Sequence, residues 1–272
     1  MRWGLGSLHI RGISVTARRL KLPASWVRLP ITLGSVLLAT ALVCAEEAKP
    51  DFQADAVPVQ QSHGYLRSHD APHYWALSPY YLPQFTDSAC SVATIAMLVN
   101  AVRITGPTEL LVTQRSLLEK VGSDQWKKET IEGGDGVTWD EFVGYTRTAL
   151  ATYGIAADVE VFKPGDNSPA TLAKLRQVLS ESEASERDIL LIYFDQGVLT
   201  GDWDGPHTSP VAAYDGEQRR VLIMDVDRES YVPYWSSDEK LLEAMLRPAP
   251  ASMGVLTGQT GGLVWVKIRS VN

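Results

Sequence analysis

The side chains best suited to chemistry are a cysteine, a histidine and an aspartate spaced widely along the chain. Cys90 begins a segment, residues 90–102, whose apolar residues recur at helical spacing, and Asp87 or Ser88 can cap its start. The dipole and the free backbone N–H groups of a helix N-terminus stabilise a thiolate. The sequence therefore predicts a reactive thiol at Cys90.

A base, and a residue to orient it, follow in the second half of the chain. His207 lies in a turn-rich segment that leads into an apolar strand starting at Val211. Asp225 ends the next apolar segment, and a hairpin would return it to the same end of the sheet as His207. A thiol, an imidazole and an orienting carboxylate together predict acyl transfer through a covalent intermediate.

Gln84 precedes Cys90 by six residues and can complete such a site. Its amide and the Cys90 backbone N–H would donate hydrogen bonds to the oxyanion of a tetrahedral intermediate. Each residue also has an ordinary interpretation, with Cys90 as a small buried side chain, His207 as a surface histidine and Asp225 as a strand-end cap. Their order and their placement on one helix and one sheet favour the catalytic interpretation.

The elements that must position these residues indicate an α+β fold, with a helical half followed by an antiparallel sheet half. Residues 62–87 are rich in aromatics and prolines without a sustained period, which predicts irregular structure packed on a core. The predicted helices cover residues 90–102, 110–121, 139–153 and 171–179, and the predicted strands cover residues 188–194, 211–214, 221–226 and 263–268.

The N-terminus has the pattern of an export signal. Residues 1–45 combine a basic stretch with an apolar run and end in the small-x-small sequence Val43-Cys44-Ala45. We expect cleavage there, a linker over residues 46–61, a catalytic domain over residues 62–272 and a periplasmic location. Two alternatives stay open: the apolar run is retained as a membrane anchor, or Cys44 is lipidated.

Cysteine content and charge limit the function further. The chain has 2 cysteines and Cys44 lies in the leader, so Cys90 is the thiol that remains after cleavage. An unpaired thiol is a liability in an oxidising compartment, which favours a chemical role. Without residues 1–45 the chain has 19 basic and 32 acidic residues, a net charge of −13. Such a surface argues against nucleic acid and anionic membranes as partners.

Several separated motifs resemble the catalytic domain of phytochelatin synthases. They include the residues around Gln84 and Cys90, the segment from His207 to Tyr214, and the segment from Asp225 to Trp235. Their order and spacing resemble that family from Ser62 to the C-terminus. By position, Cys90, His207 and Asp225 match the family's triad and Gln84 its oxyanion glutamine, while Arg228 and Tyr231 match a motif that helps hold the substrate.

The resemblance implies a papain-like fold and an enzyme that attacks the Cys–Gly bond of glutathione. The expected product is a γ-glutamylcysteinyl thioester on Cys90, with release of glycine; water or a second glutathione then takes the acyl group. Arg228 makes independent sense, since a guanidinium pairs bidentately with a carboxylate. No cofactor is expected to be required, although activation by heavy-metal ions or metal thiolates and a homodimer are compatible with the family.

The chain also departs from that pattern. Ser91 and Pro206 replace glycines that usually follow the nucleophile and precede the histidine, so the backbone approach to substrate is expected to differ. No cysteine-rich region follows the catalytic segment, which favours simple deglycylation over metal-responsive polymer synthesis.

Two other interpretations remain. One is a papain-like peptidase or amidase that acts on another periplasmic peptide, which the export signal favours. The other is a metal-binding arm formed by His63, His69 and His73 with Asp70, but Pro72 interrupts the helix that would align the last two histidines. We therefore expect no metal site.

Overall fold

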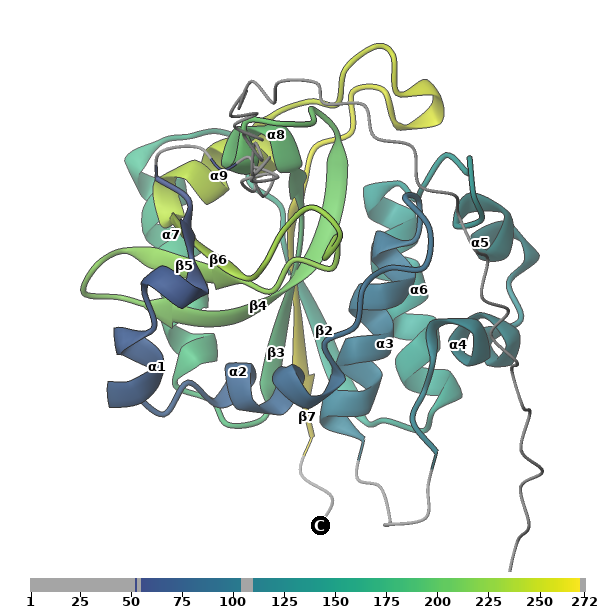
Figure 1. Ribbon diagram of the computed structural model, residues 1–272, viewed down its shortest axis with the longest axis horizontal. Coiled ribbons are helices and arrows are strands. Elements are labelled where there is room, and N and C mark those ends of the chain that lie inside the picture. The colour runs from purple at the N-terminus through teal and green to yellow at the C-terminus, as the bar shows by residue number, and fades with distance from the viewer. Residues whose placement is uncertain (1–51, 53–54, 104–109, 270–272) are drawn as a thin grey trace, which may run out of the picture. The chain divides into compact units, whose positions relative to one another are not determined.

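The computed structural model describes Phe52, residues 55–103 and residues 110–269 (Figure 1). The predicted signal peptide, residues 1–45, lies outside these residues. The chain divides into two units, Met1–Glu46 and Glu47–Asn272, and every element below belongs to the second. No helix in the described part of the chain is long and apolar enough to cross a membrane.

A seven-stranded antiparallel sheet lies at the centre of the second unit (Figure 1). Its strands lie in the order β1-β6-β5-β4-β3-β7-β2. In chain order they are β1 (Val57–Pro58), β2 (Ala157–Phe162), β3 (Asp188–Asp195), β4 (Pro206–Asp215), β5 (Arg220–Ile223), β6 (Tyr234–Ser237) and β7 (Gly262–Ile268). The last strand in sequence, β7, is therefore inserted between β2 and β3.

Helices cover both faces of this sheet. Two hydrophobic cores result. The first includes residues of α1 (Gly64–Ser68), α2 (Pro72–Leu77), α3 (Cys90–Val102), α4 (Gln114–Val121), α5 (Asp124–Glu129) and α6 (Trp139–Thr152). The second core lies against α7 (Pro169–Glu183), α8 (Gln196–Thr200) and α9 (Asp238–Leu246). Since side chains alternate along a strand, Leu191 of β3 enters the first core and Ile192 the second.

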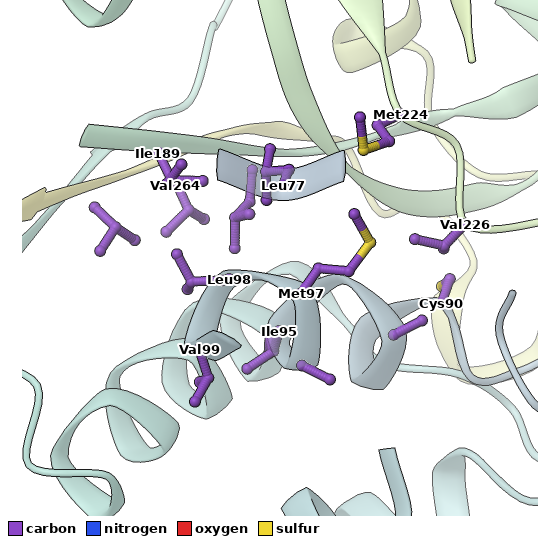
Figure 2. Packing of buried hydrophobic residues seen from close by; sticks show 14 of the residues in the cluster. Leu77, Cys90, Ile95, Met97, Leu98, Val99, Ile189, Met224, Val226 and Val264 are labelled. Carbon is purple, nitrogen blue, oxygen red and sulfur yellow. The ribbon is translucent and has the colours of Figure 1, made fainter. Parts of the chain in front are cut away.

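The helix that carries the cysteine is buried almost along its whole length. Its residues from Cys90 to Asn100 are all buried. Figure 2 shows Met97 of α3 beneath the sheet and Cys90 at the end of the helix near Val226. Leu98 is fully buried, and full burial of such a side chain contributes roughly 1.5–3 kcal/mol, so the packing of α3 on the core is strongly stabilising.

The predicted helix at 90–102 is confirmed, but its predicted cap is wrong. Ala89 occupies the N-cap position and makes no side-chain cap, because the Ser88 hydroxyl donates to the Gly134 carbonyl instead and Asp87 lines a cavity. Helix α6, the third of the predicted helices, begins at Trp139 as predicted, where Thr138 and Glu141 form a capping box.

The four predicted strands are all present, as β3, β4, β5 and β7. The predicted helix at 110–121 is shorter, because Thr113 caps α4 and fixes its start at Gln114. The helix predicted over 171–179 is longer, because Ser168 caps α7 ahead of Pro169. Within the described residues, the α+β plan is therefore confirmed.

Other elements were not predicted. Strands β2 and β6 and helices α5, α8 and α9 were missed, and the segment expected to be irregular contains α1 and α2. The expected linker over 46–61 is packed at its end, because Val57 and Pro58 pair with β6. These residues form the edge strand of the sheet and hydrogen-bond a strand that lies far away in sequence, a partner that local pattern does not reveal.

Candidate active site

Cys90 and His207 are brought together by the packing of α3 against the start of β4. The Thr94 hydroxyl of α3 donates to the Thr208 carbonyl of β4 over 3.0 Å. Both residues are buried, so this hydrogen bond fixes the helix beside the strand. Cys90 is the first residue of α3 and His207 the second of β4, and their side chains interact across this junction.

His207 and Asp225 form a buried pair. His207 Nε2 lies 2.8 Å from Asp225 Oδ1, and the two residues are 4% and 0% exposed. Because Nε2 is engaged by the carboxylate, Nδ1 is the ring nitrogen that remains for the thiol. Asp225 lies two residues after the end of β5, where the sheet no longer requires an apolar side chain.

Further groups hold Asp225 in place. Gln196 Nε2 and the Tyr234 hydroxyl each donate to Oδ2 over 3.2 Å, and the Asp227 backbone N–H donates to Oδ1 over 2.9 Å. The Tyr81 hydroxyl donates to the Asp225 backbone carbonyl. With the hydrogen bond to His207, the buried carboxylate makes four hydrogen bonds, which fix its orientation.

Sequence reasoning missed Gln196, Tyr234 and Thr208 as site residues. Tyr234 lies in a motif that resembles the family's, but neither it nor Gln196 gives a sign in the sequence of approaching Asp225. Thr208 directly follows the histidine, and its hydrogen bonds to the Cys90 thiol help lower the pKa of Cys90. Its adjacency to His207 was the one available signal.

The electrostatics of the pair favour charge separation. Burial alone would raise the pKa of Cys90, but hydrogen bonding and attraction to His207, together with Thr208, bring it below the ordinary thiol value. Burial alone would lower the pKa of His207, but Asp225 and Cys90 raise it well above the ordinary imidazole value. A thiolate beside an imidazolium is thus the favoured state.

Gln84 lies at the same site. Its backbone N–H donates to the Val226 carbonyl over 2.9 Å, which joins the loop before α3 to the loop after Asp225. Its Nε2 makes one long hydrogen bond of 3.4 Å to the Asp87 carbonyl, and its Oε1 is buried without a hydrogen-bond partner among the described residues. The Gln84 side-chain amide therefore makes few hydrogen bonds within the protein and can turn towards a bound oxyanion.

A cavity of about 410 Å³ opens over Cys90 and His207. Gln84, Gln196 and Tyr231 also line it. Such a volume is in the range of small-molecule sites. The structure therefore places a reactive thiol, an imidazole and an amide around a space that holds a tripeptide-sized ligand.

The two predicted substrate-binding residues lie differently. Tyr231 lines the cavity, is buried, and donates from its hydroxyl to Asp202 Oδ2 over 2.8 Å. Arg228 is exposed and lines an adjoining hollow; it donates to the Tyr81 carbonyl over 3.2 Å, and its guanidinium lies 4.4 Å from the centre of the Tyr81 ring. The residues that line the cavity do not include Arg228, and its substrate role stays a prediction.

The two departures from the expected glycines have separate positions. Ser91 is fully buried, and its hydroxyl accepts a hydrogen bond of 3.0 Å from Trp126 Nε1, so it faces the core between α3 and α5 and does not line the cavity. Pro206 does line the cavity and pairs with Asp195 at the first position of β4. Only the second departure lies at the site.

The histidines of the proposed metal-binding arm have other partners. His73 is buried, hydrogen-bonds the Ser185 carbonyl over 3.1 Å, and has its pKa lowered by burial to about 4. His69 stacks on the Tyr65 ring at 4.1 Å. Across residues 55–103 and 110–269, no three potential ligands of the His, Cys, Asp or Glu type gather as a metal site would require.

Comparison with known proteins agrees with these motifs. The chain is 25% identical over 178 residues to glutathione gamma-glutamylcysteinyltransferase 1 of Arabidopsis thaliana, covering 63% of this chain and 33% of that protein. It is also 25% identical over 193 residues to glutathione gamma-glutamylcysteinyltransferase of Schizosaccharomyces pombe, covering 71% of this chain and 42% of the relative. The chain thus spans well under half the length of these relatives.

The family model for phytochelatin synthase matches residues 59–254. This range includes every residue predicted for the site, from Gln84 to Tyr231, and all the residues that line the cavity around Cys90 except Leu256. The match extends over most of the chain and over both halves of the fold. The chain therefore belongs to the phytochelatin synthase family.

Proposed function

We propose that this chain cleaves glutathione between cysteine and glycine through a γ-glutamylcysteinyl thioester on Cys90. The observation that carries the proposal is the pair Cys90 and His207 at the cavity with Asp225 buried behind the imidazole, and the pKa values of the thiol and the imidazole shifted in opposite directions. Membership of the family and the names of the similar relatives support glutathione as the substrate.

In the first half of the reaction, the Cys90 thiolate attacks the carbonyl carbon of the Cys–Gly peptide bond. Gln84 Nε2 and the Cys90 backbone N–H donate to the oxyanion that forms. The first N–H groups of a helix have no intrahelical acceptor, so the backbone of α3 can make this contact. The His207 imidazolium then donates its proton to the glycine nitrogen, the C–N bond breaks, and glycine leaves.

In the second half, neutral His207 takes a proton from water, and the water oxygen attacks the thioester. Collapse of that intermediate releases γ-glutamylcysteine and restores the Cys90 thiolate. A second glutathione can replace water through its amine, which would give a phytochelatin. We propose that hydrolysis dominates and that transpeptidation is a minor path. Asp225 keeps the imidazole in position in both halves.

The test is incubation of the purified protein with glutathione, with glycine and γ-glutamylcysteine quantified by mass spectrometry. We expect the two products in equal amounts, and a Cys90→Ser variant that forms neither. Acid quenching in the first turnover should leave wild-type Cys90 carrying the mass of one γ-glutamylcysteinyl group. If reduced, folded protein forms neither product, the proposal is wrong; if the Cys90→Ser variant keeps full activity, the mechanism is wrong.

A panel of unrelated peptides distinguishes the second candidate, a papain-like peptidase or amidase with another peptide substrate. Faster cleavage of those peptides than of any γ-glutamylcysteinyl compound would favour that candidate.

We further propose that the catalytic segment acts outside the cytoplasm, since residues 1–45 have the composition of an export signal. Cleavage after Ala45 gives a free periplasmic protein, and retention of the apolar run gives an anchored one. We propose that no cofactor is required, because side chains and backbone supply each proton transfer and the oxyanion contacts. Activation by heavy-metal ions or metal thiolates and a homodimer stay predictions.

A further inference from the structure

The lining of the catalytic cavity is acidic. Four aspartates lie among its described residues, and these residues include no lysine or arginine. The aspartates are Asp87, Asp135, Asp202 and Asp227. The exposed indole of Trp203, 44% accessible, lines the same cavity.

These carboxylates are not neutralised by basic side chains. In the described part of the chain, no ion pair joins any of the four to lysine or arginine. Asp202 accepts from the Tyr231 hydroxyl, which is a neutral donor. Burial raises the pKa of Asp227, attraction to His207 opposes that rise, and the neighbouring Asp225 carboxylate adds to it. The lining therefore has four carboxylates and one cationic side chain, the His207 imidazolium that is already paired with Asp225, so acidic groups outnumber basic ones where a ligand enters.

Glutathione suits such a cavity at one end only. Its γ-glutamyl end has an ammonium beside its carboxylate, and aspartates can bind the ammonium. Its glycine end has a carboxylate alone. An unpaired carboxylate among others of the same sign is unfavourable, since like charges repel and desolvation is not repaid by a partner.

The indole adds a preference of its own. The face of tryptophan attracts ammonium groups and does not attract carboxylates. Trp203 follows Asp202 directly, so an aromatic face and a carboxylate lie together at the cavity. This pairing of groups favours a cation.

We propose, resting on the function proposed above, that the preferred acyl donor is a γ-glutamylcysteinylglycine compound whose glycine carboxylate is blocked as an amide, with a cationic amide preferred over a neutral one. The chemistry is unchanged. The Cys90 thiolate forms the thioester, the Cys–Gly C–N bond breaks, and the glycine amide leaves with the proton from His207. Water then hydrolyses the thioester to γ-glutamylcysteine.

Three donors that differ only at the glycine end test this selectivity. They are glutathione, its glycinamide, and its amide with ethylenediamine, whose ends carry charges of about −1, 0 and +1 at neutral pH. All three release γ-glutamylcysteine, so one assay gives kcat/KM for each. We expect kcat/KM to rise along the series by roughly tenfold in total, and the difference to shrink in about 1 M salt because salt screens exposed charges.

Charge-neutral variants assign the effect to the cavity. The double variant Asp135→Asn/Asp202→Asn should lose most of the preference for the cationic donor. Its matched control, Glu119→Gln/Glu186→Gln, removes two exposed carboxylates that do not line the cavity and should keep the preference.

The outcomes separate the two proposals. Cleavage of none of the three donors overturns the proposed function itself. Cleavage of all three with glutathione equal or best overturns only the inference about charge. If glutathione is best and Arg228→Gln selectively weakens its cleavage, Arg228 reaches the glycine carboxylate from the adjoining hollow, and the inference is wrong.

Discussion

The ionic state of Cys90 depends chiefly on His207, with a smaller contribution from Thr208. Without His207, burial would raise the pKa of the thiol; with the imidazolium beside it, the pKa falls below 9.0. Asp225 acts one step further away, because it keeps His207 protonated and oriented. The reactivity of the thiol is therefore a property of the three residues together.

Alkylation of Cys90 measures this coupling. In the wild type, the rate of reaction with iodoacetamide should already be substantial at about pH 6 and rise only modestly towards about pH 8, since the lowered pKa of Cys90 increases the thiolate fraction there. In a His207→Gln variant the pKa should rise, so the rate should be low at about pH 6 and climb steeply towards alkaline pH. Matching profiles for the two proteins would contradict the ion pair. Circular dichroism checks that the variant is folded.

At the residue scale, the sequence predicted the three residues of the reaction itself and missed the residues that hold Asp225 in place. Cys90, His207 and Asp225 stood out because their types, order and expected elements fit one reaction, and the structure brings them together. Gln196 and Tyr234 contact Asp225 from α8 and β6, which approach it only after the sheet has formed. No local pattern announces such contacts.

Glu183 is a largely buried acid at the contact between α7, α1 and β4. Glu183 ends α7, accepts from the Tyr65 hydroxyl of α1 over 3.0 Å, and accepts from the Tyr214 backbone N–H of β4 over 2.9 Å. Burial is the main cause that raises its pKa to about 7, and Asp215 adds to the rise while His69 opposes it. This contact is therefore sensitive to pH.

The sign of that sensitivity follows from linkage. The folded pKa of Glu183 lies above its ordinary 4.5, so the folded state binds more protons and its stability falls as pH rises from about 4.5 to about 7. Denaturant unfolding should show a loss on the order of 2 kcal/mol from this group. A Glu183→Gln variant should flatten that slope. Glu186→Gln, an exposed neighbour, is the control and should leave it unchanged.

At the element scale, prediction succeeded where a buried apolar run or a clear helical period marks the element in the sequence. The helix at Cys90 and the apolar strands β3, β4 and β7 follow from local pattern. Strand β2 was missed although Asp158 and Glu160 alternate with apolar neighbours, because it lies at the sheet edge and is half exposed. Helix α9 was missed although Ser237 caps its start and two acidic residues follow in its first turn.

At the scale of the whole molecule, two cores share one sheet. Leu117 of α4 is fully buried on one face and Leu241 of α9 on the other. Because the strands between them contribute side chains to both cores, loss of either core exposes the same sheet. The two halves should therefore unfold as one unit.

Truncation of each leucine tests this cooperativity. Leu117→Ala and Leu241→Ala should each lower the free energy of unfolding by about 2–5 kcal/mol. Hydrogen exchange monitored by mass spectrometry should show faster global exchange in α6 and α7 alike in both variants. If Leu241→Ala speeds exchange only in α7 and its neighbours, the two cores are independent.

The position of β7 also has a consequence in time. This strand comes last in the described sequence, yet it lies between β2 and β3 and joins them. A ribosome adds roughly 5–20 residues per second, so β2 and β3 wait several seconds with unpaired edges until residue 268 has been made. The thiol at Cys90 and its imidazole are synthesised long before the sheet that surrounds them can close. The edges of β2 and β3 that β7 covers in the folded sheet therefore lack this partner until the last strand has been made.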